Sequence, residues 1–403
     1  MKNDDVLHFV KDKGIDFVRV GLVTPTGEIR SASIPQKKLK EVLEGGMSIH
    51  PFSLDQNTTE PRNSIVLPDP VSFRETPLYS SGEHGVRTAM MLGDVHNWDG
   101  SPSKLCSRTA LKNALKGIPG QAIVGTETEW FYRNPDGSLP PINGDIHYFK
   151  DDLIDPMTFT RLATAKNLDE MGIPVAKTEK DSGTTSHEIS LVHTDALTAA
   201  DNLLMARGVI RDTARKHNLI ADLSPKARLD DWGTALHFNM SLQNGGKNVF
   251  NNNGQLSAEA IRFGEGILNN AALLNFFLNS RRDSYDRFDP RFYVGTATTM
   301  GPSSFNMIRT FEGNEDLTRL EIRNPDNHTN PHLGLTALLT AGIGGMRGQP
   351  TDGKYRHFVK SIDEATALVE SIIQSGQSHL LGVPAELLNV LVAKNRKESI
   401  KEN

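Results

Sequence analysis

Arg319-Leu320-Glu321-Ile322-Arg323 is the stretch that says most about how this chain folds and where its chemistry lies. Alternate side chains of a β-strand share a face, so Leu320 and Ile322 point one way while Arg319, Glu321 and Arg323 point the other. Taken alone, the pattern also fits a strand whose polar face is simply solvated. The interpretation therefore depends on whether the pattern recurs.

It recurs in three further segments. In Thr126–Trp130, the polar face carries Glu127 and Glu129, and in Ser186–Ser190 it carries Glu188. In His237–Leu242, the polar face carries His237, Asn239 and Ser241. Four strands with acids, a histidine or arginines on one face can line a single polar cavity. Such a cavity would suit metal ions and a polyanion.

The whole chain sets wider limits. Its 403 residues favour two domains, for which we predict the ranges 1–100 and 101–403. Its 37% of hydrophobic residues is typical of a soluble globular protein. Its net charge of −5 gives no overall positive potential, so a nucleic-acid partner is not expected. Neither a signal peptide nor a membrane span is predicted, and the single cysteine, Cys106, fits a reducing compartment. We therefore expect a cytoplasmic location.

The first hundred residues predict a small, strand-rich unit. A hairpin is expected over 16–34, a helix over 36–43, and strands near 64–67 and 89–95. A linker at 99–103 would precede a helix starting near Arg108.

The remainder combines the four polar-faced strands with helices predicted over 197–217, 258–278 and 333–346, and with a polar tail, 394–403, that we expect to fray. Strands and helices do not alternate regularly, which favours an α+β fold with a mainly antiparallel sheet.

The polar faces favour a particular chemistry. Carboxylates with one imidazole suit Mg²⁺ or Mn²⁺, and nearby arginines can neutralise a transferred phosphoryl group. For each arginine, a structural ion pair with a neighbouring acid is the equal alternative. A nucleophilic role for Cys106 is disfavoured because no histidine partner is evident. The glycines at 342–345 follow an apolar helical pattern, so they indicate a helix end rather than a dinucleotide site.

Taken in order, these segments resemble the glutamine synthetase family. The resemblance covers about residues 16–346 and rests on GTETEWF at 125–131, SHEIS at 186–190, DALTAADN at 195–202, SPKA at 224–227, GTALHFNMSL at 233–242, and RLEIRNPD at 319–326 with Asn330-Pro331. VLPDP at 66–70 resembles the end of the family's N-terminal β-grasp domain. The implied fold is a β-grasp-like domain followed by a catalytic domain with a curved, mainly antiparallel sheet covered by helices.

The resemblance also implies an activity. Family members use ATP and divalent metal to phosphorylate a carboxylate, which an amine then converts to an amide, and they form rings or double rings. By position, Glu129, Asp181 and Glu188 would bind one metal, and Glu127, His237 and Glu321 the other. Arg309 and Arg319 would contact nucleotide phosphates beside Asn239 and Ser241. The acid substrate would meet Trp232, Gly233, Arg287 and Arg323, and Asp55 would come from a neighbouring subunit to help bind the amine; Asp55, Arg309 and Glu321 are the expected catalytic residues.

Several positions depart from the family pattern. Glu179-Lys180-Asp181 replaces His-His-Glu, so Lys180 brings a cation next to a metal ligand. The loop that holds the α-amino group reads Asp231–Ala235 and contains Trp232. The flap that closes the family's active site is shortened here to 287–293 and has no glutamate to deprotonate ammonium. Ser304 stands where the family has an arginine, and Asp55–Thr58 replaces the family's aspartate-glycine-serine-serine motif.

The metal and phosphate half of the pattern is therefore kept, and the ammonium half is not. We expect a ligase that joins glutamate or a related acid to an amine other than ammonia. Two alternatives stay open: a ligase for a different acid, selected by Trp232, and a catalytically silent scaffold of the same fold. The partners expected are a small-molecule acid, a small-molecule amine and further copies of the chain.

Overall fold

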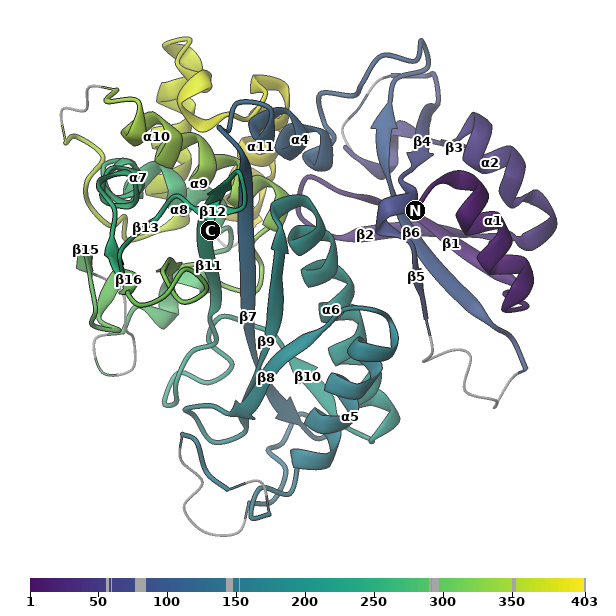
Figure 1. Ribbon diagram of the computed structural model, residues 1–403, viewed down its shortest axis with the longest axis horizontal. Coiled ribbons are helices and arrows are strands. Elements are labelled where there is room, and N and C mark those ends of the chain that lie inside the picture. The colour runs from purple at the N-terminus through teal and green to yellow at the C-terminus, as the bar shows by residue number, and fades with distance from the viewer. Residues whose placement is uncertain are drawn as a thin grey trace.

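A computed structural model describes residues 1–55, 58, 60–76, 85–142, 148–151, 153–289, 291, 297–349 and 353–401. The chain forms a smaller lobe from its N-terminal part and a larger lobe from the rest (Figure 1). The α+β class predicted from the sequence is confirmed. In the described ranges, no helix is both long and apolar enough to cross a membrane.

The smaller lobe is built on a six-stranded sheet in the order β2-β1-β6-β4-β3, with β5 paired to β6. The predicted hairpin is present as β1 and β2, and β1 also pairs in parallel with β6. Helices α1 and α2 cover this sheet (Figure 1). The bounds of these elements are α1 Asn3–Asp12, β1 Phe17–Val23, β2 Ile29–Pro35, α2 Leu39–Gly45, β3 Met47–Ile49, β4 Ser64–Pro68, β5 Arg74–Glu75 and β6 Thr88–His96.

The larger lobe contains a nine-stranded sheet in the order β15-β16-β17-β11-β7-β9-β8, with β10 added to β7 and β12 to β11. All of its pairings are antiparallel except β15 with β16. Its strands are β7 Gln121–Arg133, β8 Val175–Lys180, β9 Ser186–Asp195, β10 Ile220–Asp222, β11 Leu236–Asn244, β12 Lys247–Asn248, β15 Ala297–Gly301, β16 Asn306–Phe311 and β17 Arg319–Ile322. A separate two-stranded sheet joins β13 Asn251–Asn252 to β14 Gln255–Leu256.

Helices pack on the apolar side of this sheet. One core joins β7, β11 and β17 to α7, α8 and α9, and a second joins β7 and β9 to α5 and α6 (Figure 1). Phe238, Leu320 and Ile322 are fully buried here, so the apolar faces deduced from alternation are confirmed. The helices are α4 Ser107–Leu115, α5 Thr158–Glu170, α6 Ala196–Lys216, α7 Ala258–Leu268, α8 Ala271–Leu278, α9 Pro331–Met346, α10 Ile362–Gln374 and α11 Ala385–Lys401.

Two predictions about helices were wrong. The helix expected over 258–278 is two helices, because the chain breaks at Asn269-Asn270, a residue type that competes with its own backbone for hydrogen bonds. The tail expected to fray from 394 is helical as far as the structure describes it, since α11 continues to Lys401. Contacts with α10 hold it: Arg396 pairs with Glu370, and Ser399 donates to Asp363.

The glycines of α9 have a packing role. A Cβ on Gly342 would lie 2.3 Å from the Phe263 ring, and one on Gly345 would lie 2.2 Å from the Arg262 carbonyl oxygen. Glycine therefore allows α9 to approach α7 closely, in the last turns of the helix. Cys106 is buried at the start of α4, where its sulfur accepts from the Val95 amide at 3.3 Å.

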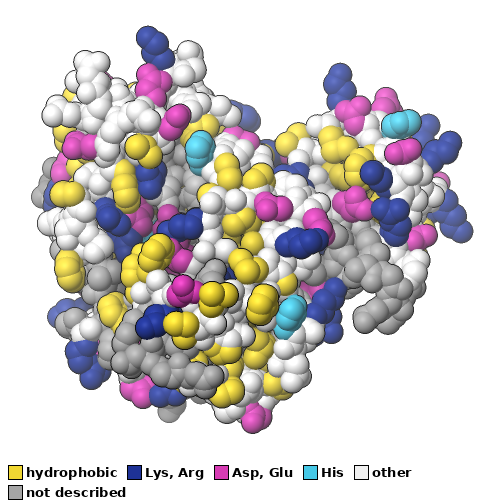
Figure 2. Space-filling model, turned by 60° about the horizontal axis from the view of Figure 1, so that its bottom comes forward, with side chains coloured by type: hydrophobic (Ala, Val, Ile, Leu, Met, Phe, Trp, Pro, Cys, Tyr) yellow, Lys and Arg dark blue, Asp and Glu magenta, His cyan; other side chains and the backbone are white. Residues whose placement is uncertain are grey.

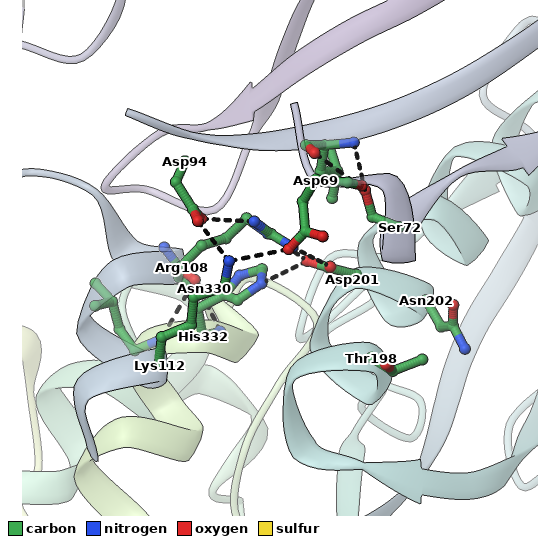
Figure 3. A network of polar contacts seen from close by, with 12 residues as sticks. Asp69, Ser72, Asp94, Arg108, Lys112, Thr198, Asp201, Asn202, Asn330 and His332 are labelled. Carbon is green, nitrogen blue, oxygen red and sulfur yellow. Dashed lines mark hydrogen bonds and ion pairs between the residues drawn. The ribbon is translucent and has the colours of Figure 1, made fainter. Parts of the chain in front are cut away.

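A buried ion network joins the two lobes (Figure 3). Arg108 on α4 is 1% exposed and makes a two-pronged contact with Asp201 on α6, at 3.0 and 2.7 Å. It also binds Asp94 at 2.6 Å and Asp69 at 3.1 Å, both from the smaller lobe. On the other side of Asp201, His332 of α9 lies 2.8 Å away. The division into domains at residue 100 stays a prediction, but this network shows how the two parts are held together.

Candidate active site

The strand register aligns the polar faces predicted from the sequence. Glu129 on β7 stands opposite Glu188 on β9, and Glu188 stands opposite Glu179 on β8. On the other side, His237 on β11 is opposite Glu127. Directly opposed residues have side chains about 5 Å apart. Register thus concentrates carboxylates that are distant in sequence.

Two groups of ligand atoms result, and they share His237. Glu127, His237 and Glu321 form one, and Glu129, Glu188 and His237 form the other; within each, the atoms lie within 4.8 Å of one another. His237 Nδ1 is 2.9 Å from Glu127 and 3.3 Å from Glu321. The structure therefore brings together all five side chains that the polar strands suggested. Asp181 lines the same cavity without joining either group.

Charge repulsion and burial shape this cluster. Burial raises the pKa of Glu188 well above its usual range, and Glu127 and Glu129 raise it further. Burial and Asp181 likewise raise the pKa of Glu129. Glu127 differs: burial opposes its charge, but hydrogen bonds from His237 and Asn239 hold its pKa at about 2. A divalent cation is the usual compensation for such a group of acids, and their oxygen-rich character fits Mg²⁺ or Mn²⁺.

Lys180 lies outside the two groups of ligand atoms, but its cation lies next to Asp181, as the sequence predicted: burial raises the pKa of Asp181, and Lys180 opposes that shift. Lys180 is 1% exposed and points to the opposite side of β8, where its ammonium donates to the backbone carbonyls of Asp181 at 2.6 Å and Gly183 at 2.5 Å. Burial lowers its pKa to about 8.

Lys177 was missed by the sequence reasoning. It lies in the cavity with its ammonium 2.8 Å from Glu179, and Glu188 and Glu127 add to the attraction. Alternation along β8 places Lys177 and Glu179 on one face, so the same rule that identified the other acids would have found both.

The arginines gather at the other side of the acids. Arg323 forms an ion pair with Glu321, and Arg309 lies 3.9 Å from the second oxygen of the same carboxylate. Arg319 donates to Asn239 at 2.7 Å. Phe311, also missed, carries the guanidiniums of Arg309 and Arg319 at 4.6 and 3.9 Å from its ring centre. This stacking holds two like charges near the acids.

Two hollows meet at this cluster. One, of about 510 Å³, is lined by both acid groups and by Trp232, Gly233, Arg309 and Arg323. The other, of about 440 Å³, is lined by Asn239 and Ser241. Both hollows have Glu127, Lys177 and Arg319 in their walls. The arrangement can therefore hold two different molecules in contact with one set of charges.

The remaining predicted residues have mixed positions. Trp232 is 36% exposed in the wall of the first hollow. Position 233 requires glycine because the backbone passes close to Arg287: a Cβ at this position would lie 2.8 Å from the Cβ of Arg287. Arg287 itself is buried and donates to the Pro325 carbonyl at 2.7 Å, so it supports the backbone after β17 as well as lining the hollow.

Asp55 lies apart from the cluster. It lines a hollow between the β1–β2 turn and α11, and the five central side chains are not in that wall. Within one chain it does not meet the acids, so its predicted role depends on a neighbouring copy. Phe292 and Tyr293 of the shortened flap, and Gln56 and Asn57, lie outside the described residues.

Comparisons with known proteins agree with this architecture. Residues 101–357 match the family described as glutamine synthetase, catalytic domain. Glutamine synthetase of Staphylococcus aureus strain MW2 is 28% identical over 361 residues, which cover 86% of this chain and 80% of that protein; the enzyme of Staphylococcus epidermidis gives the same values. The chain belongs to the glutamine synthetase family of ligases.

Solved structures show the same fold. GmaS in complex with ADP superposes with a TM-score of 0.86 at 22% identity, over 98% of this chain and 96% of that one. Glutamine synthetase of Plasmodium falciparum superposes with a TM-score of 0.85 at 22% identity, over 100% of this chain and 96% of that one. The predicted curved sheet and its helical cover are thereby confirmed.

Proposed function

We propose that this protein is an ATP-dependent carbon–nitrogen ligase that phosphorylates the carboxylate of glutamate or a related acid and joins it to an amine other than ammonia. One observation carries the proposal: two hollows share Glu127, Lys177 and Arg319 in their walls, and they meet at two groups of side chains whose atoms are close enough to hold metal ions. Membership of the family supports the reaction class.

The residues present fit the expected cofactors. Burial and neighbouring acids raise the pKa of Glu129 and Glu188, and a divalent cation would relieve the repulsion between these groups. Glu129 and Glu188 would hold one Mg²⁺ or Mn²⁺, with Asp181 nearby, and Glu127, His237 and Glu321 the other. Bound metal would supply charge neutralisation to a transferring phosphoryl group. Arg309 and Arg319, braced on Phe311, would orient the phosphates, with Asn239 and Ser241 beside the nucleotide.

The acid substrate would occupy the first hollow. Arg323 and Arg287 would provide positive charge for its carboxylates, and Gly233 gives the chain its close approach to Arg287. The indole of Trp232 occupies part of the same wall. We therefore expect the α-amino end of the acid to be contacted differently here than in other members of the family. Asp55 would be supplied by a neighbouring copy, and we propose a homo-oligomer, of ring type, for that reason.

The test is phosphate release by purified protein with Mg²⁺, ATP and glutamate, across a panel of primary amines and ammonium. Release should depend on the amine and exceed the rate with ammonium. A panel of deaminated or N-substituted diacids separates a change of acid from a change of amine. If neither panel gives turnover above that of Glu321→Ala, the proposal is wrong.

A silent scaffold is the second candidate, and two contacts favour it. Lys177 places its own cation among the acids, and Arg323 already pairs with Glu321. Such internal pairs can replace a metal's charge. Binding of Mn²⁺ and nucleotide without turnover on either panel would support this candidate.

A further inference from the structure

The junction of the two lobes contains a hollow of about 690 Å³, larger than either hollow of the candidate active site. Its walls come from β1 and β2 of the smaller lobe and from α6, the segment after α8, the segment after β17 and α11 of the larger lobe. In Figure 2, lysine and arginine side chains lie beside the place where the two lobes meet. We call this space the junction hollow.

Its wall carries a surplus of positive charge. Five cationic side chains line it, against two acids: Arg19, Arg207, Arg211, Arg281 and Lys394, against Glu28 and Asp212. Both acids are already paired with cations outside the wall. Asp212 binds Arg215 at 2.7 Å, and Glu28 lies 3.7 Å from Arg30. Among the cations, Arg281 and Lys394 are likewise paired with acids outside the wall, Asp283 at 2.9 Å and Glu398 at 3.6 Å. The wall itself still contains more cations than acids.

Arg207 is the unusual member. It is 5% exposed, and one of its nitrogens, Nη1, donates to the Thr329 carbonyl at 3.0 Å. Its Nε and Nη2 are buried without a hydrogen-bond partner in the part of the chain that the structure describes. Burial, with Arg211 nearby, lowers the pKa of Arg207 to about 9, so it still carries its charge at neutral pH. A buried charge with unused donors is costly unless something binds it.

His328 supplies a second unused donor or acceptor. Its Nε2 is buried and, among the described residues, has no hydrogen-bond partner. Burial and Arg281 lower its pKa to about 3, so the ring is neutral and can give or accept one hydrogen bond. Methionine and leucine side chains, among them Met90, Met171 and Leu204, form the apolar part of the wall.

We propose that the junction hollow is a second ligand site, which binds a small anion bearing carboxylate or phosphate groups with Arg207 as its buried anchor. The fork of Nε and Nη2 matches two oxygens of either group. Arg211 and Arg281 would add charge from the mouth, and His328 would contact a further oxygen. The apolar wall would strengthen these contacts by excluding water.

The site touches the back of the candidate active site. Asn327 lines the junction hollow, and its side chain donates to the Glu129 carbonyl at 2.6 Å and accepts from the Thr128 hydroxyl. The same residue therefore contacts the strand that carries Glu127 and Glu129. The proposed site is nevertheless separate from that of the ligase reaction, and it does not depend on the proposed function.

The experiment is calorimetric titration of the assembled, metal-free protein with succinate in one arm and inorganic phosphate in the other, at constant ionic strength. Binding should be seen in at least one arm, and the arm identifies the group. Arg207→Met should weaken that binding at least about tenfold, since charged hydrogen bonds are lost. Arg262→Met, an exposed arginine of α7 paired with Glu259, is the matched control and should leave binding unchanged.

Two further variants keep the result unambiguous. Arg211→Met, at an exposed position, should weaken binding even if Arg207→Met fails to fold. Arg319→Met removes a cation from the candidate active site and should leave this binding intact. The proposal fails if neither anion binds at millimolar concentration, if Arg207→Met and Arg211→Met both bind as the parent does, or if Arg319→Met alone abolishes binding.

Discussion

Replacing Glu188 by glutamine should stabilise the metal-free protein while it weakens metal binding. In this cluster, Glu188 and Glu129 oxygens lie within 4.8 Å, and burial and neighbouring acids raise the pKa of both. The metal-free fold therefore bears a repulsion that the unfolded chain does not. Glutamine keeps the shape of the side chain and removes the charge.

The magnitude follows from Coulomb's law. Two unit charges 4.8 Å apart repel by about 3 kcal/mol at an effective dielectric constant of about 20. Because burial and neighbouring acids raise the pKa of Glu188 and so favour its neutral form, the gain on removing its charge is smaller than this Coulomb figure. Losing a carboxylate ligand should weaken Mn²⁺ binding by more than about tenfold.

The assay is thermal unfolding with and without Mn²⁺ at one protein concentration, together with Mn²⁺ titration. With chelator present, Glu188→Gln should unfold at a higher temperature than the parent. With saturating Mn²⁺, the order should reverse, because only the parent gains the full binding energy. Glu259→Gln, at an exposed glutamate of α7, is the control and should change neither result. A metal-free Glu188→Gln protein less stable than its parent would refute the repulsion argument.

The other predictions concern three parts of the molecule. Glu321→Ala should abolish amine-dependent phosphate release while size-exclusion chromatography shows the assembly unchanged. Lys177→Met should tighten Mn²⁺ binding, because it removes an ammonium that competes for Glu179 and Glu188; weaker binding would show that Lys177 supports the site. Arg108→Met should cost about 3–5 kcal/mol of stability, as urea unfolding would show, because it removes the guanidinium that pairs with the buried Asp201, while Lys112 still pairs with Asp69 and Asp94. The stability difference between the parent and Asp201→Asn should shrink on acidification. Burial opposes the charge of Asp201, but Arg108 and His332 hold its pKa below the ordinary value. The contribution of the Asp201 charge to folding stability is therefore complete above about pH 4 and is lost as the pH falls through the pKa of the folded protein.

Alternation along the chain predicted more of the candidate site than of the fold. Because side chains change face at every residue of a strand, Glu127, Glu129 and Glu188 could be assigned to polar faces without coordinates. The same rule reaches Lys177, which was overlooked. Helix ends were less predictable: Asn269-Asn270 breaks a pattern that is apolar on both sides, and periodicity alone does not register such a break.

The sequence by itself determined which side chains share a face, the α+β class, and the family, since all of these are properties of local order along the chain. Only the tertiary structure decided which faces meet. Strand register set Glu129 opposite Glu188 and His237 opposite Glu127, and the direction of one side chain removed Lys180 from the cluster. The junction hollow, too, was decided only by the tertiary structure. Arg207 and His328 come together only when the helix, the loop and the smaller lobe pack. Such long-range packing produces no periodic pattern in the sequence.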